Sequence, residues 1–269
     1  ELNTTNISSQ HFSWETRFNA TFLRSELLEL NDGLQNLSNV YFVGQPLLTY
    51  NVPKYAGVNP ADGNPMWYDK NGNITYNPVA ADRQFMGSQL PKGFGGVTNT
   101  FSYKGITLNA FVQYQYGNKI NNTDAQFMRR MGSTIDRNQD RSELRRWQKP
   151  GDMTDTPKPY YKTGVPTGGQ AGGITYIAPY SLVSSRFIED GSYIRLKEVS
   201  LAYSFPSAMI KRAGLRNLKV YGQAYNLATL TRFSGVDPEF QGASSTTSAT
   251  YSGIVPQYTN LTFGVQVGF

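Results

Sequence analysis

The chain has 269 residues, of which 16% are charged and 13% are aromatic, and its formal net charge is +6. It contains no cysteine and a single histidine, His11, which excludes a disulfide framework, a thiolate metal site and a histidine metal cluster. It also lacks a run of about 18 apolar residues, so it predicts no transmembrane helix. A charge-poor composition rich in tyrosine, phenylalanine and glycine instead favours a sheet protein with polar loops.

The same features argue against catalysis and against nucleic-acid binding. His11 lies in Ser9-Gln10-His11-Phe12-Ser13, which is no nucleophile signature, and a Ser-His-Asp triad would have to use this histidine. The basic residues are scattered among loops and form no stripe. The sequence therefore predicts a protein that is not an enzyme, holds no cofactor or metal and binds no nucleic acid.

The first predicted strand covers about 14–22, where even positions that are apolar except for Thr16 alternate with polar or charged odd positions. Trp14 at its start is typical of a side chain at a membrane interface. A turn signal at Asn31-Asp32-Gly33 and a short segment lead to a second predicted strand at about 46–56. In this second strand one parity carries Leu48, Tyr50 and Val52.

Residues 57–93 hold so many Gly, Pro, Asn and Asp residues that they predict a long loop. Within it, Asp69-Lys70-Asn71-Gly72-Asn73 is similar to the start of a calcium-binding loop, but the glycine and the glutamate that complete an EF-hand are missing. We therefore predict a plain turn at this position.

A hairpin follows, with strands at about 94–104 and 106–117 joined by Lys104-Gly105. In the second strand the even positions from Ile106 to Tyr116 are apolar or aromatic, while most odd positions are Thr, Asn or Gln. Such a strand suits a wall with lipid on one side and a water-filled lumen on the other. A soluble sandwich shows the same alternation, so this pattern alone leaves both folds open.

The segment 118–190 lacks sustained alternation, and a loop of this length is improbable in a compact domain unless it is functional. Beyond it, strands are predicted at about 191–205 and 216–230, separated by a short basic connector. In the first of these strands the apolar parity changes near Lys197-Glu198, which predicts a β-bulge. A Gly/Ser/Thr-rich loop at about 231–257 follows.

The final predicted strand, 260–269, alternates without a break. Its apolar parity ends at Phe269, and its other parity carries small uncharged residues including two glycines. Strands of roughly 9–11 residues with this pattern are what a tilted transmembrane strand requires.

Connection lengths now favour one fold. Working back from the last strand, the connections are alternately long and short, at about 231–257, 206–215, 118–190, 104–105, 57–93 and 31–45. An up-and-down barrel with short periplasmic turns and long external loops produces this alternation, whereas a sandwich has no reason to. We therefore predict an all-β fold, an antiparallel up-and-down transmembrane β-barrel, over residues 1–269 with no separate second domain.

Several stretches resemble the SusC/RagA-like family of TonB-dependent outer-membrane transporters. The matching pieces are Gly57-Val58-Asn59-Pro60 through Tyr68-Asp69-Lys70-Asn71-Gly72, Arg146-Trp147 with Pro150-Gly151-Asp152, Glu189 through Tyr203, Asn217 through Tyr221, Tyr225-Asn226-Leu227, Gly235-Val236-Asp237-Pro238-Glu239 and Thr262-Phe263-Gly264. They occur in the family's order from about residue 14 to 269.

The resemblance implies a plugged 22-stranded barrel in the bacterial outer membrane that imports glycans or peptides, with energy from the TonB complex and a SusD-like lipoprotein as lid. The predicted strands, about seven, match only the last third of such a barrel, and the plug and the TonB-contacting segment are absent. We therefore expect a C-terminal portion of a longer polypeptide. A secreted carbohydrate-binding β-sandwich and a siderophore-type TonB-dependent receptor are the alternatives.

The predicted site residues follow from this interpretation. Loops 57–93 and 118–190 are expected to meet the lid protein or an oligosaccharide or peptide substrate. Aromatic side chains there could stack on the substrate, although packing within the loops is the commoner role for each: Trp67, Tyr68, Trp147, Tyr160 and Tyr161. Phe269 resembles the C-terminal aromatic signal that the barrel-assembly machinery reads.

Overall fold

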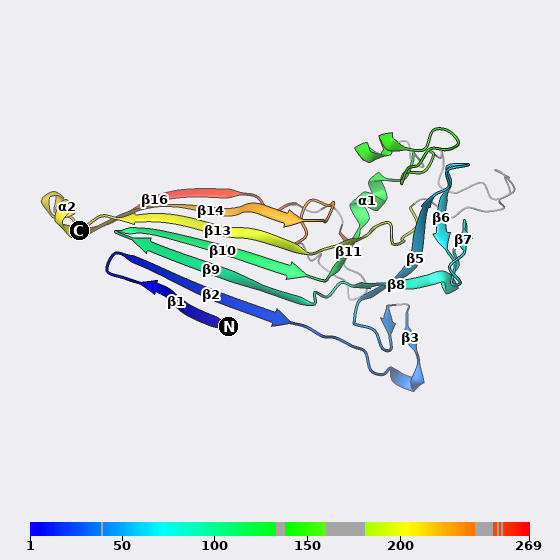
Figure 1. Ribbon diagram of the computed structural model, residues 1–269, viewed down its shortest axis with the longest axis horizontal. Helices are drawn as coiled ribbons and strands as arrows, with labels where there is room; N and C mark the ends of the chain where they lie inside the picture. The colour runs from blue at the N-terminus through cyan, green and yellow to red at the C-terminus, as the bar shows by residue number, and fades with distance from the viewer. Residues whose placement is uncertain (39, 133–137, 160–180, 240–249, 252, 254) are drawn as a thin grey trace.

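The computed structural model describes residues 1–38, 40–132, 138–159, 181–239, 250, 251, 253 and 255–269. Its dominant element is one antiparallel sheet, here called the main sheet, with the strand order β1-β2-β9-β10-β13-β14-β16. Its strands are β1 (Leu2–Ser8), β2 (Phe12–Phe22), β9 (Gly93–Tyr103), β10 (Ile106–Tyr116), β13 (Tyr193–Ser204), β14 (Asn217–Thr231) and β16 (Asn260–Gly268). Figure 1 shows these strands running side by side along the length of the molecule.

The main sheet confirms the predicted antiparallel wall and its alternating connections. Short connections at 9–11, 104–105 and 205–216 lie at one end, and long connections at 23–92, 117–192 and 232–259 leave from the other (Figure 1). The turn at 104–105 joins Tyr103 directly to its partner Ile106, and Lys104 and Gly105 both have positive φ, as a two-residue hairpin turn requires. Here the end with the short connections is called the turn end.

The prediction that 46–56 is a strand of the wall is wrong, and one strand of the wall, β1, was not predicted. The segment 46–56 forms β5 (Thr49–Val58), which pairs with β6 and β8 in a separate sheet and belongs to the long connection between β2 and β9. Consequently 31–45 is no turn-end connection. The strand β1 was missed because a register shift between Thr5 and Ile7 interrupts its alternation and because most of its residues are polar.

The predicted bulge in β13 is confirmed. Along both neighbouring strands the register shifts at Lys197, between Leu196 and Glu198. Between the shift and the turn end, the odd residues of β13 lie on the apolar face of the sheet. On the other side of the shift, the even residues lie on that same face, so the shift keeps the apolar residues on one side of the sheet.

Glycine and aromatic residues face each other across several strand pairs. The pairs are Gly93 with Tyr116, Gly95 with Tyr114, Gly222 with Phe263 and Gly264 with Tyr221. At Gly264 a Cβ atom would lie 2.4 Å from the Tyr221 ring, so the ring covers the space that a side chain would need. An aromatic ring over a glycine supports the strand where the glycine offers no side chain for packing.

The long connections carry the remaining elements, here called the cap, at the end opposite the turn end (Figure 1). One sheet has the order β7-β6-β5-β8 and another the order β12-β11-β15. The strands are β3 (Asn36–Leu37), β4 (Tyr41–Phe42), β6 (Pro65–Tyr68), β7 (Ile74–Thr75), β8 (Arg83–Ser88), β11 (Lys119–Asn122), β12 (Ile188–Asp190) and β15 (Thr250–Tyr251). Single turns of 3-10 helix are η1 (Asn31–Gly33), η2 (Ala80–Asp82) and η3 (Arg141–Arg145), and α1 (Thr123–Met128) is α-helical.

One short helical stretch lies at the turn end, formed by α2 (Ser207–Ile210) and η4 (Lys211–Ala213). In the part of the chain that the structure describes, no helix has the length and hydropathy needed to cross a membrane. A turn is present at 69–73 as predicted, since the Asp69 carboxylate accepts the N–H groups of Asn71 and Asn73 at 2.8 Å and closes the β6–β7 hairpin.

Candidate functional site

The main sheet has an outer face that is almost entirely apolar. The register places on it Phe18, Val97, Val112, Leu196 and Ala228 in one row across the sheet, with comparable residues above and below. Several of these side chains are largely exposed, including Phe263 at 81%, Val265 at 64% and Leu261 at 60%. A soluble sandwich would cover this face with a second sheet, and the described residues supply none.

A polar cluster near the β1 edge interrupts the outer face, where the Asn6 amide donates to the Thr16 hydroxyl at 2.7 Å and the Thr4 hydroxyl donates to Asn6 at 3.0 Å. The Asn99 side-chain oxygen accepts hydrogen bonds from the Trp14 indole N–H at 2.9 Å and from the Thr16 hydroxyl at 2.7 Å. Because these groups satisfy one another, the cost of placing them against hydrocarbon is reduced.

The opposite, inner face is predominantly polar, although Phe94 and Phe111 also face inward. Its residues include Glu15, Arg17, Asn19, Thr98, Thr100, Thr107, Asn109, Gln113, Ser200, Lys219, Gln223, Thr262 and Gln266. Charges and amides that face inward, with apolar side chains facing outward, are the arrangement of a wall between lipid and a water-filled lumen.

A buried ion-pair network, here called the clasp, fixes the β14–β16 connection against the inner face. The Arg195 guanidinium, on the inward side of β13, donates to the Asp237 carboxylate at 2.5 Å and to the Glu239 carboxylate. Its Nε donates to the Thr229 hydroxyl at 2.8 Å, and the Lys197 amine reaches Glu239 at 2.7 Å. Arg195 is only 3% exposed, so its charge depends on these partners.

Asp237 also holds the two ends of this connection together. Its carboxylate accepts the backbone N–H groups of Glu239 at 2.9 Å and Gln257 at 3.0 Å. Burial alone would raise the pKa of Asp237, but the hydrogen bonds from Arg195 and from these two N–H groups outweigh it, so the pKa lies below its ordinary value. The carboxylate is therefore ionised at neutral pH and ties the connection to the wall.

A second set of hydrogen bonds joins two long connections to each other. The Glu189 carboxylate accepts the N–H and the hydroxyl of Ser234, each at 2.7 Å, and the Asn122 amide at 3.0 Å. The Asn122 side-chain oxygen accepts the N–H of Ala125 and so caps α1. Nearby, the Tyr50 hydroxyl accepts the N–H of Asn121, and burial raises the pKa of Tyr50 to about 12.

The predicted aromatic residues have different surroundings. Trp67 is 1% exposed and packs edge-on against Tyr55, with 5.9 Å between ring centroids. Trp147 packs against Gly63 and donates its indole N–H to the Pro60 carbonyl at 2.9 Å, which joins two long connections. Tyr68 is half-buried, with the Lys54 amine 5.2 Å from its ring. Tyr160 and Tyr161 lie outside the described residues.

Both tryptophans are thus packing residues in this structure, and a role in substrate contact stays a prediction, for which Tyr68 is the accessible candidate. Phe269 is 83% exposed beyond the end of β16, and its role as an assembly signal likewise stays a prediction. The clasp residues were named only as parts of matching motifs. Charged residues on the inward parity of β13 were the signal that could have singled them out.

At the junction of cap and wall lies a cavity of about 690 Å³. It is formed where the long connections leave the main sheet, and its lining includes three basic residues, Arg24, Lys92 and Lys119. This cavity gives the rim of the wall a positive, partly enclosed surface.

An antiparallel sheet with one lipid-compatible face, one polar face and every long connection at the same end defines a segment of a transmembrane β-barrel wall. No family model matches the sequence. The TonB-dependent receptor P3 of Formosa agariphila is 26% identical over 265 residues, covering 88% of this chain and 24% of that receptor. The receptor P26 of the same organism is 26% identical over 300 residues, covering all of this chain and 28% of that receptor.

Solved structures show the same fold. The RagAB peptide transporter matches with a TM-score of 0.80 at 24% identity, and the RagAB peptide importer in its closed-closed state with 0.78 at 25%. Each match covers 99% of this chain and 28% of that chain. The chain is therefore homologous to TonB-dependent receptors of the SusC/RagA-like type, which reside in the bacterial outer membrane. It spans about a quarter of the length of these relatives.

Proposed function

We propose that this chain forms part of the wall and external surface of a TonB-dependent active transporter that imports large nutrients and performs no covalent chemistry. The observation that carries the proposal is the contrast between the two faces of the main sheet. Phe263 faces outward at 81% exposure, while its neighbours Thr262 and Gly264 face the other side. A wall of this kind encloses a polar passage and needs no catalytic group.

The orientation follows from the connections. Outer-membrane barrels have short periplasmic turns and long extracellular loops, so the turn end belongs in the periplasm and the cap outside the cell. In this orientation the clasp lies on the lumen side of the wall near its external rim. It would hold the β14–β16 connection where a substrate enters.

The remaining parts of the transporter must come from elsewhere in the polypeptide. The main sheet is open, with β1 and β16 at its edges. An unpaired strand edge in hydrocarbon costs several kcal/mol for each unsatisfied backbone group, so both edges need neighbouring strands. We assign the plug and the TonB contact to that remainder.

A SusD-like lipoprotein is the proposed lid, and the cap is its proposed contact surface. The RagAB structures are described as a peptide transporter and importer, which supports a peptide substrate, with an oligosaccharide as the other choice. Tyr68 on β6 is exposed enough to stack on either substrate. A siderophore-type receptor would need no such lid, so co-purification of a surface lipoprotein separates the two candidates.

The test uses the complete transporter in cells that depend on it for growth. Epitope tags inserted after Gly72 in the cap and after Gly214 at the turn end mark the two sides of the membrane. We expect antibody to label intact cells only at the cap tag, and uptake to stop when TonB is deleted. Labelling at the turn end would overturn the orientation, and TonB-independent uptake would overturn the transport proposal.

A further inference from the structure

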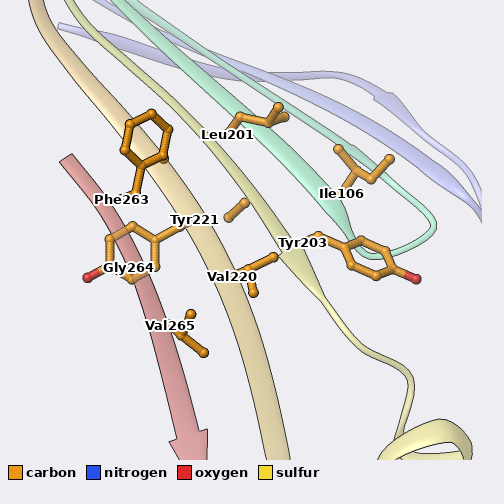
Figure 2. A pocket seen from close by; sticks show the side chains of 10 residues that line it. Ile106, Leu201, Tyr203, Val220, Tyr221, Phe263, Gly264 and Val265 are labelled. Carbon is orange, nitrogen blue, oxygen red and sulfur yellow. The ribbon is translucent and has the colours of Figure 1, made fainter. Parts of the chain in front are cut away.

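A groove of about 960 Å³ lies close to the turn end, and seven of its ten lining residues are on the outer face; the other three, Ala202, Tyr221 and Gly264, belong to the inward parity. Its lining is Ile106, Leu201, Ala202, Tyr203, Val220, Tyr221, Gly222, Phe263, Gly264 and Val265. Figure 2 shows these side chains spread over β10, β13, β14 and β16, with the helical connection after β13 at the lower edge. The groove therefore opens toward hydrocarbon in the half of the wall nearest the turns.

Gly222 creates the hollow. Its register neighbours are Leu201 and Phe263, both outward-facing, so the floor between two large side chains has no side chain of its own. A Cβ atom there would meet the Phe263 ring at 3.2 Å, so the ring leans over the glycine from one side. The resulting walls are apolar and suit a hydrocarbon chain.

Basic residues flank the groove at the turn end. The Lys104 amine lies 5.4 Å from the centroid of the outward-facing Tyr103 ring, beside Ile106 of the groove. Arg216 is exposed, and it continues the outward parity of β14 below Val220. The connection between β13 and β14, which ends at Arg216, adds Lys211 and Arg212, both exposed. None of the turn-end connections, 9–11, 104–105 and 205–216, contains an Asp or Glu residue.

We propose that this surface binds an anionic phospholipid, with one acyl chain in the groove and the phosphate group between Lys104 and Arg216. An apolar slot that ends in basic side chains at the depth of the lipid headgroups is complementary to this ligand. Tyr103 and Tyr203 supply the interfacial aromatic residues at the same level. The choice of the periplasmic leaflet rests on the orientation proposed above, while the binding site itself does not.

A second copy of the chain fits this surface less well. A symmetric dimer through the groove would bring the two sets of basic residues together, because such an interface uses the same patch twice. Like charges at close range oppose association. An anionic headgroup neutralises the same residues and therefore favours the lipid.

The test is lipid retention by the complete transporter in nanodiscs of equal parts phosphatidylethanolamine and phosphatidylglycerol. After detergent exchange, native mass spectrometry counts the phosphatidylglycerol that stays bound. The test variants are Lys104→Gln/Arg216→Gln, which removes the phosphate contacts, and Gly222→Val, which fills the groove. The matched control is Arg17→Gln/Lys219→Gln, which removes two exposed basic residues from the inner face of strands in the same sheet.

We expect the wild type and the control to retain phosphatidylglycerol selectively. The charge variant should lose about fivefold in preference for each basic residue removed, from about 1 kcal/mol per residue near a membrane surface. Gly222→Val should lower retention of both lipids alike. Equal selectivity in the charge variant and the control would overturn the proposal. The lipid proposal would also be overturned if the wild-type transporter showed no preference for phosphatidylglycerol while its uptake and orientation were intact. That result would leave the proposed transport function unaffected.

Discussion

Replacing Arg195 with methionine should release the β14–β16 connection from the wall and leave the main sheet intact. Arg195 and Asp237 have side chains that are 3% and 4% exposed, so the substitution strands a buried carboxylate. Removing one partner of a buried pair costs about 3–5 kcal/mol. The remaining Lys197–Glu239 pair is 25% and 19% exposed and contributes about 1 kcal/mol or less, so it cannot replace the lost contact.

Hydrogen exchange measures this loss locally in the complete transporter. The reporters are the N–H groups of Glu239 and Gln257, because both donate to Asp237. A cost of about 3 kcal/mol corresponds to roughly a hundredfold increase in their opening equilibrium. Amides in β10 should keep their wild-type protection.

Two further variants make the result interpretable. Arg17→Met removes an exposed arginine from the same inner face and should leave both reporters unchanged. Arg195→Met combined with Asp237→Asn removes both charges but keeps a neutral side-chain oxygen at position 237 as an acceptor for the reporter N–H groups. This double variant should recover part of the protection, since no buried charge is left alone at this pair. If the two reporters exchange equally fast in Arg195→Met and Arg17→Met, the clasp does not hold this connection.

The remaining predictions concern pH, packing and the aromatic residues. Because the folded-state pKa of Asp237 is depressed, the stabilisation that its carboxylate gives is complete above the unfolded pKa of about 3.9 and is lost as pH falls through the lower folded pKa. Hydrogen-exchange protection of the Gln257 N–H should therefore stay level from pH 7 to 5 and decline below about pH 4. In Asp237→Asn this protection should be insensitive to acid. Gly95→Ala should reduce the fraction of folded transporter, measured as the fraction whose gel mobility changes on heating, since its Cβ would lie 2.2 Å from the Asn19 carbonyl and overpacking costs about 1–3 kcal/mol. Gly222→Ala should fold normally, because its Cβ would meet the movable Phe263 ring. Trp147→Ala should expose the cap to protease, with a loss of about 3–5 kcal/mol of stability. Tyr68→Ala should lower substrate uptake and keep wild-type protease resistance. Protease sensitivity in Tyr68→Ala, or wild-type resistance with reduced uptake in Trp147→Ala, would refute the roles given to these two residues.

Six of the seven wall strands could be predicted, because each of the six carries a two-residue period and is bounded by turn or loop signals, which β1 is not. β16 and the 104–105 hairpin are the clearest cases, and even the bulge at Lys197 was visible as a change of apolar parity. The same signal misassigned β5, since Leu48, Tyr50 and Val52 alternate like a wall strand although β5 pairs within the cap. Alternation reports a strand but does not identify its partners.

The clasp could not be predicted from the sequence in the same way. Arg195 and Asp237 are 42 residues apart, and they meet only because the connection after β14 folds back over the inner face. The packing roles of Trp67 and Trp147 depend on long connections that touch each other, which no local pattern encodes. The sequence does place two charged residues, Arg195 and Glu198, on the inward parity of β13, a signal that the strand prediction did not use.

The central claim is that the outer face of the main sheet contacts lipid and the inner face contacts water. Single cysteines at Phe263, Val265, Thr262 and Gln266, introduced into the complete transporter with any other cysteine replaced, test it along one strand. The account predicts that a membrane-impermeant maleimide labels positions 262 and 266 in membranes, while only a lipid-soluble reagent labels positions 263 and 265. Equal labelling at all four positions, or the inverse pattern, would contradict it.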